Sequence, residues 1–155
     1  MRVRENTRRI IWFGRAVLAG ATMLMARIAI AYIYDPVSAV APHGILLGSA
    51  EAITIMRVSG GVFLGIALAL VACLVSEERL LTGLGTLAII ATTITAVRLV
   101  GAVIDGPAPF TLMVLKPEIG LVVASSMAFW LEYRRHAATE RGADGAATPS
   151  PAVRG

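Results

Sequence analysis

Four long apolar stretches restrict how this chain folds more than any other feature of its sequence. A helix needs about 20 mostly apolar residues to cross the roughly 30 Å hydrocarbon core of a bilayer. Apolar residues make up 57% of the 155 residues and charged residues only 15%, a balance that excludes a water-soluble globular enzyme. We therefore predict an all-α integral membrane four-helix bundle, with helices over about residues 10–34, 52–75, 80–104 and 110–131.

The four helices form one predicted domain, residues 10–135. Only residues 76–79 separate the second helix from the third, and so short a turn requires an antiparallel hairpin. A basic segment, residues 1–9, precedes the domain. Residues 136–155 are largely Ala, Gly, Pro, Thr and Ser, and we expect a disordered tail because this composition buries too little apolar surface to become ordered.

The positions of the basic residues predict the orientation of the bundle, because cytoplasmic loops are rich in lysine and arginine. The loops at 35–51 and 105–109 contain neither residue. Both termini are therefore predicted to be cytoplasmic, in a bacterial inner membrane. The net charge of +4 is then explained by the arginines that set this orientation. We therefore expect no nucleic-acid partner. Eight arginines fall on the cytoplasmic side in this topology: Arg2, Arg4, Arg8, Arg9, Arg79, Arg134, Arg135 and Arg141.

Each predicted helix also keeps one cation inside its apolar stretch, toward the extracytoplasmic end. An arginine at the centre of a membrane helix is unfavourable by about 2.5–3.5 kcal/mol. We therefore expect these cations to turn inward and meet carboxylates, backbone carbonyls, water or a bound anion. The cations are Arg27, Arg57, Arg98 and Lys116, and the acids in the same zone are Asp35, Glu51, Asp105 and Glu118. The predicted ligand-binding residues are Arg27, Glu51, Arg57, Arg98, Asp105, Lys116 and Glu118.

Small residues and a proline accompany these charges. Arg57 shares a helix face with Gly60, Gly61 and Gly65, and Gly61 and Gly65 form a GxxxG step that permits close helix packing. Pro117 removes a helical hydrogen bond beside Lys116 and Glu118, and an interrupted helix with ionisable residues indicates a binding site. Three interpretations stay open: ion pairs that only fix packing, a polar cavity for a ligand, and snorkelling to the headgroups.

Other polar residues have simpler interpretations. Arg15 is interpreted as an anchor at the cytoplasmic interface, and Trp12 as part of an aromatic belt there. His43 is interpreted as a loop histidine, with an acid–base role as the alternative. One cysteine, Cys73, and two histidines exclude a disulfide scaffold, a CxxC redox pair and an ordinary zinc site, so we expect no cofactor and no metal.

Several segments together resemble a known family. They are Tyr34-Asp35-Pro36, Pro42-His43-Gly44-Ile45, Glu51 with Arg57-x-x-Gly60-Gly61, and Arg98 with Asp105-Gly106. The sequence is similar over about residues 15–131 to a family of small bacterial four-helix membrane proteins described as a domain of unknown function. The resemblance implies this fold and a membrane location and supplies no reaction. A looser similarity to DoxX-type four-helix proteins rests on architecture alone.

The leading hypothesis is an accessory inner-membrane protein with membrane lipid around it and a homo-oligomeric or membrane-protein partner. Its charged cluster would stabilise the bundle and bind an anionic lipid or a small anion. One alternative is a membrane enzyme acting on a lipid or quinone-like substrate. Glu51 or Asp105 would then be the acid–base group, and Arg57 or Arg98 would stabilise an anion. Another alternative is an oligomeric transport subunit.

Overall fold

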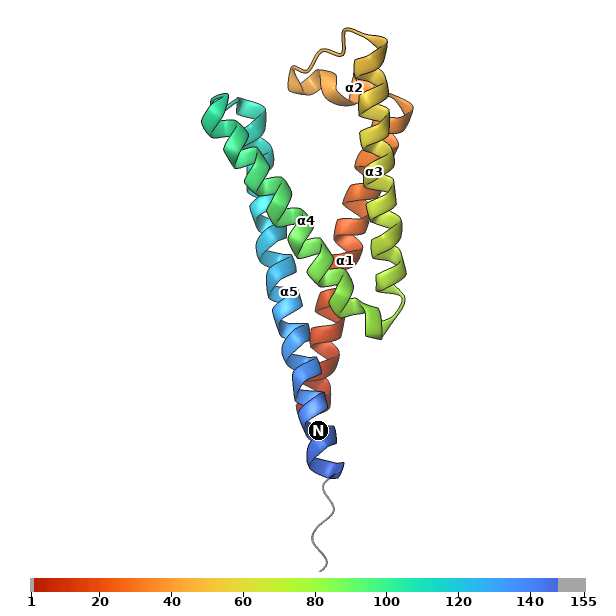
Figure 1. The fold of residues 1–155 in the computed structure, drawn as a ribbon, viewed down its shortest axis with the longest axis vertical. Coiled ribbons are helices and arrows are strands. Elements are labelled where there is room, and N and C mark those ends of the chain that lie inside the picture. The colour runs from red at the N-terminus through yellow and green to blue at the C-terminus, as the bar shows by residue number, and fades with distance from the viewer. Residues whose placement is uncertain (1, 148–155) are drawn as a thin grey trace, which may run out of the picture.

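The computed structural model describes residues 2–147, and all structural statements here refer to this part of the chain. It is all-helical, with no strand in the described range, as the sequence predicted. Figure 1 shows its elements: α1 (Arg2–Tyr34), α2 (Pro36–Val40), the 3-10 helix η1 (Ala41–His43), α3 (Ala50–Leu74), α4 (Glu77–Ile104) and α5 (Pro109–Ala147).

Four of these helices are long and apolar enough to cross a membrane: α1, α3, α4 and α5. The prediction of a multi-pass membrane protein is thus confirmed in its fold and helix composition. The 25 residues of α3 extend about 37 Å at 1.5 Å per residue, slightly more than the thickness of a hydrocarbon core. In hydrocarbon only such hydrogen-bonded helices satisfy every backbone polar group within the segment.

The helices form two antiparallel hairpins. The first hairpin consists of α1 and α3, the second of α4 and α5, and each pair makes extensive contacts along its length. Figure 1 shows the two hairpins together near the α3–α4 turn and separated at the other end. We call the end with the α3–α4 turn the turn end, and the end with residues 35–49 and 105–108 the loop end. The N-terminus lies beyond the turn end, beside the last turns of α5.

The hydrophobic core lies where the four long helices meet. Its largest side chains are leucines from α1, α3 and α4, and all of them are fully buried. Partly buried aromatic residues of α1 and α5, Phe13 and Phe129, pack against this core. Since lipid is as apolar as leucine, such packing contacts, rather than exclusion from water, hold the helices together. The buried core residues are Leu18, Ala21, Leu70, Leu80, Leu84, Leu87 and Ala128.

A glycine brings α1 and α3 into close contact, but the predicted GxxxG step does not. A β-carbon on Gly60 would lie 2.9 Å from Cγ1 of Ile33 and 3.0 Å from the backbone oxygen of Ala29. Gly61 and Gly65 have no neighbouring atom within 4 Å of such a position. The close helix contact therefore depends on Gly60, and the face with Gly61 and Gly65 is open.

The helix boundaries differ from the prediction at both ends of the chain. Helix α1 begins at Arg2 rather than near residue 10, and Glu5 accepts a hydrogen bond from Arg9 Nη2 at 2.6 Å within it. Helix α5 continues to Ala147, so residues 136–147 are helical rather than disordered. This segment contains five alanines, which favour helix, whereas the prolines and serine of the predicted tail come later. Residues 148–155 lie outside the described residues.

The loop between the first two membrane helices contains two short helical segments, α2 and η1. Asp35 caps the short helix α2, and Ser38 N–H donates to its carboxylate at 3.1 Å. Ser49 caps α3 in the same way, accepting from the backbone N–H of Ala52 at 3.1 Å. These side chains satisfy donors that the first turn of a helix otherwise leaves unpaired.

Gly60→Ala tests the close contact between α1 and α3. We expect a loss of about 1–2 kcal/mol in stability, because overpacking costs about 1–3 kcal/mol and the gain in helix propensity recovers up to about 1 kcal/mol. Gly61→Ala, on the open face, is the matched control and should be neutral or stabilising. Thermal unfolding in detergent, followed by circular dichroism, measures both. Equal melting temperatures for the two variants would contradict this account.

Candidate functional site

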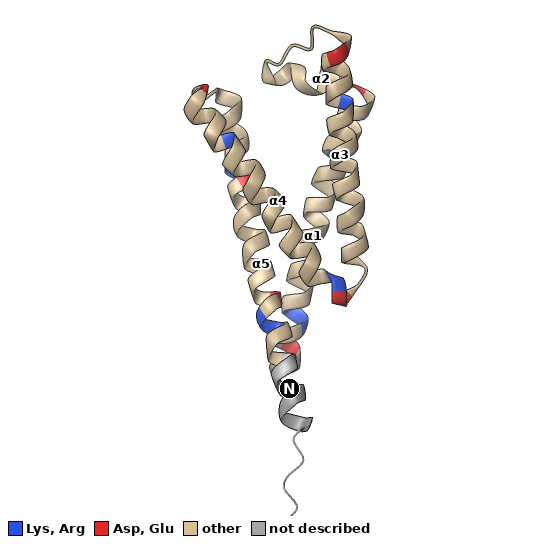
Figure 2. Ribbon diagram, viewed as in Figure 1, with Lys and Arg blue, Asp and Glu red and all other residues tan. Residues whose placement is uncertain are grey.

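Charged residues lie toward the two ends of the helices and leave the middle of each long helix without charge (Figure 2). The set at the loop end corresponds to the residues predicted from sequence. We call it the loop-end charge cluster: Arg27, Asp35, Glu51, Arg57, Arg98, Asp105, Lys116 and Glu118.

One ion pair in this cluster joins α4 to α5. Nε of Arg98 donates to Oε2 of Glu118 at 2.8 Å, and the two side chains are 26% and 17% exposed. Charge-assisted hydrogen bonds of this length are among the stronger ones in proteins. The structure thus brings two predicted residues together, in the second hairpin.

The other three cations behave differently. Arg27, Arg57 and Lys116 are exposed, and among residues 2–147 none of them makes an ion pair. This differs from the expectation that all four cations turn inward. Gly60 packs against Ala29, Tyr32 and Ile33 of the antiparallel α1, so Arg57 lies about two turns, or roughly 10 Å, nearer the loop end than Arg27.

The other acids of the cluster lie at helix ends. Hydrogen bonds from the Ser38 side chain, and then from its backbone N–H, lower the pKa of Asp35 below its ordinary value. Glu51 is exposed in the first turn of α3, where the helix dipole favours a negative charge. Asp105 is exposed and ends α4. These three carboxylates therefore do not neutralise the exposed cations.

An aromatic contact connects the two hairpins at the loop end. The ring of His43, at the end of η1, stacks on the ring of Phe110 with centroids 4.2 Å apart. The guanidinium of Arg98 lies 6.0 Å from the centroid of the same Phe110 ring. His43 is thus more than a loop histidine, because it links the η1 segment to the helix pair that holds the Arg98–Glu118 ion pair.

Pro117 lies within a continuous α5 rather than between two half-helices. Its neighbours on either side have different surroundings, since Lys116 is exposed and Glu118 is partly buried against α4. The proline therefore marks the level of the ion pair, and the predicted interruption of the helix is not present.

Family comparison connects this geometry to known sequences. Residues 13–131 match the profile of DUF4345, described as a domain of unknown function. The chain belongs to the DUF4345 family. The matched span contains the whole loop-end charge cluster and nearly all of the four apolar helices, so the resemblance seen in the sequence is confirmed. No curated protein and no solved structure matches this DUF4345 chain significantly.

A second charged group, at the turn end, was not predicted. Glu132 is only 1% exposed, and Nε of Arg135 lies 3.0 Å from each of its carboxylate oxygens. His136 Nε2 lies 3.5 Å from the same carboxylate. The spacing of three and four residues along one helix was the available signal, since such residues are neighbours on a helix surface. Burial of Glu132 depends on tertiary packing and could not be inferred from that spacing.

Two cavities of the described chain lie away from the loop-end charge cluster. One, of about 290 Å³, is a shallow depression on α4 lined by Ala88, Ile89, Thr92 and Thr93. A larger one is at the turn end. Within the described residues, no three His, Cys, Asp or Glu side chains lie close enough to hold a metal ion. Neither of these two cavities is lined by a residue of the loop-end charge cluster.

Glu118→Gln tests the ion pair between α4 and α5. Loss of the acceptor charge leaves Arg98 partly buried without a counter-charge, and after allowance for solvent access we expect about 1–2 kcal/mol of destabilisation. Glu51→Gln, at an exposed helix start, should change stability by less than about 0.5 kcal/mol. A double-mutant cycle with Arg98→Gln in a detergent unfolding assay isolates the coupling. A coupling energy near zero would show that the pair does not hold the hairpin.

His43→Ala tests the link between the hairpins. Stacked aromatic pairs contribute about 0.5–1.5 kcal/mol, so without the ring the loop ends should separate further and more variably. Spin labels at the exposed positions Leu46 and Val103, in a Cys73→Ala background, report this distance by pulsed electron resonance. Ile45→Ala, in the same loop, is the control and should leave the distance distribution unchanged. An unchanged distribution in His43→Ala would refute the link.

Proposed function

We propose that this DUF4345 protein is an accessory inner-membrane protein whose loop-end charge cluster both braces the bundle and binds an anion. The anion is the phosphate of an anionic lipid headgroup or a small soluble anion. The observation that carries the proposal is that Arg27, Arg57 and Lys116 have no ion-pair partner in the described chain, although all three lie in helices long and apolar enough to span a membrane.

Energetics supports an external partner for these cations. A cation within the apolar part of a membrane helix is costly unless it finds a counter-charge or reaches water. Arg98 has its counter-charge in Glu118, which explains the bracing part of the proposal. Arg57 has none within the described chain, and a guanidinium offers a planar fork that suits two oxygens of a phosphate.

The surroundings of Arg57 leave room for such a ligand. Gly61 lies one turn along the same face of α3 and has no atom within 4 Å of the position of a β-carbon. Gly65, one turn further, is equally open. An acyl chain or a small anion can therefore approach the guanidinium closely along this face, which a larger side chain would obstruct.

The location of the protein is part of the same proposal. We place both termini in the cytoplasm and the loop end on the extracytoplasmic side of a bacterial inner membrane. The support is the absence of lysine and arginine from the loops at 35–51 and 105–109, together with the arginines near both termini. The anion would then belong to the outer leaflet or to the extracytoplasmic solution.

Arg57→Gln tests the anion-binding part. A hydrogen bond to a charged group contributes about 1.5–3 kcal/mol, so we expect roughly ten- to hundredfold weaker binding of phosphatidylglycerol, with folding intact. Native mass spectrometry of the purified protein in detergent measures the number of bound lipids and their affinity. Arg9→Gln, an exposed arginine paired with Glu5 at the other end of the molecule, is the control and should retain the lipid.

The same measurement separates the two sources of phosphate and the structural alternative. Glycerol phosphate in place of phosphatidylglycerol tests the soluble anion. Binding of the lipid alone assigns the site to the headgroup in its membrane context. Loss of detergent-stable folding in Arg57→Gln, or unchanged lipid affinity, would contradict the proposal.

A further inference from the structure

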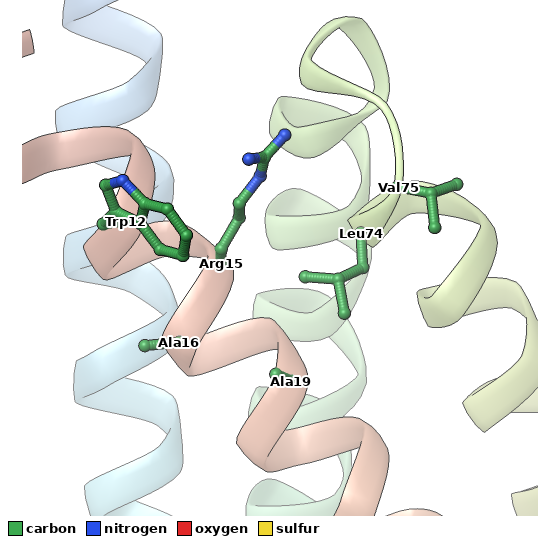
Figure 3. A pocket seen from close by; sticks show the side chains of 6 residues that line it. All are labelled: Trp12, Arg15, Ala16, Ala19, Leu74 and Val75. Carbon is green, nitrogen blue, oxygen red and sulfur yellow. The ribbon is translucent and has the colours of Figure 1, made fainter. Parts of the chain in front are cut away.

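A second candidate binding site lies at the turn end, separate from the loop-end charge cluster. A cavity of about 520 Å³ opens between α1 and the end of α3. Its lining is almost entirely apolar, and the two alanines contributed by α1 leave its floor open. Figure 3 shows the residues that line it: Trp12, Arg15, Ala16, Ala19, Leu74 and Val75.

Arg15 is the only charged residue in this lining, and its guanidinium has a donor without a hydrogen-bond partner in the described chain. Figure 3 shows its guanidinium between the Trp12 ring on one side and Leu74 on the other. Its Nε is buried and has no hydrogen-bond partner in the described chain. The carboxylate of Glu77 lies 3.7 Å from Nη2, which is too long for a hydrogen bond, and that side chain is more than half exposed.

The depth of the cavity in a bilayer matches the level of lipid phosphates. Helix α3 is slightly longer than a hydrocarbon core, and Leu74 is its last residue. Arg15 lies beside Leu74 and Val75 and is therefore at the interface, where arginine and tryptophan side chains commonly meet headgroups. The predicted role of Arg15 as an interface anchor is consistent with this placement.

We propose that this cavity binds one anionic phospholipid from the leaflet at the turn end. The phosphate accepts hydrogen bonds from the two terminal nitrogens of Arg15, in the paired geometry that guanidinium groups form with phosphate. One acyl chain lies over Ala16 and Ala19 and against Leu74. Charge complementarity selects this occupant: the walls are apolar, and the one charged group in them is a cation with a free donor.

The proposal does not depend on the function proposed for the loop end. Arg15 and Arg57 lie at opposite ends of the first hairpin, and the turn-end cavity includes no residue of the loop-end charge cluster. The two sites would also face opposite leaflets. A variant at one site should therefore leave the other unaffected.

Fluorescence of Trp12 reports occupancy of this cavity directly. In a Trp130→Phe background Trp12 is the remaining tryptophan, and phosphatidylglycerol with brominated acyl chains, titrated into micelles of the protein, should quench it at saturation. Arg15→Gln should raise the half-saturating lipid concentration about tenfold. Arg9→Gln and Arg57→Gln are the controls and should leave it unchanged, although Arg57→Gln is expected to weaken the loop-end site.

Two further variants keep the test decisive. Ala19→Leu retains the arginine but fills the floor of the cavity, so it should also weaken quenching. Should Arg15→Gln fail to fold, Arg15→Lys keeps the positive charge without the fork and should bind several-fold more weakly. Equal quenching by brominated phosphatidylcholine and phosphatidylglycerol would overturn the choice of an anionic lipid. Self-association that covers Trp12 and excludes lipid would overturn it in favour of a second copy of the chain.

Discussion

The energetic cost of an uncompensated charge in hydrocarbon is the constraint on which the rest of this structure depends. The related cost of backbone groups without hydrogen bonds requires helices, because each helix satisfies its own backbone hydrogen bonds. The charged side chains then differ in whether they have a partner. Arg98 meets Glu118 across α4 and α5, whereas Arg27 and Arg57 have no carboxylate within reach in the described chain. The unpaired cations are the basis of our proposal that a counter-charge comes from outside the chain.

Packing and charge are concentrated at opposite ends of the bundle. Buried leucines such as Leu18 and Leu84 hold the four helices together near the turn end, and the hairpins separate toward the loop end (Figure 1). The connection there is local: His43 stacks on Phe110, and Asp35 orders the segment that carries His43. Regions with few buried contacts open at the lowest free energy, and mobile or ligand-binding elements are drawn from them. The loop end has this character.

The sequence predicted the helices well because their signals are local. Apolar length defines the four spans, and Asp35-Pro36 and Gly106-Pro107 mark where helices end. The sequence predicted that the charges lie at a similar level of the bundle. It did not predict that Arg98 pairs with Glu118. That choice depends on how α4 and α5 are rotated against each other, which no local pattern specifies. Burial of Glu132 and the position of Gly60 between α1 and α3 depend on packing in the same way.

The two hairpins differ in how they compensate their arginines. Arg27 and Arg98 occupy similar positions, seven or eight residues before an acid that follows the helix. In the second hairpin, α5 provides Glu118 as the partner of Arg98. In the first hairpin, α3 has another cation, Arg57, at a comparable distance from its start. Glu51 lies about a turn and a half from Arg57 and is exposed. The second hairpin therefore pairs its arginine internally and leaves Lys116 exposed, whereas the first presents two exposed arginines, of which Arg57 shares a helix face with the open position of Gly61.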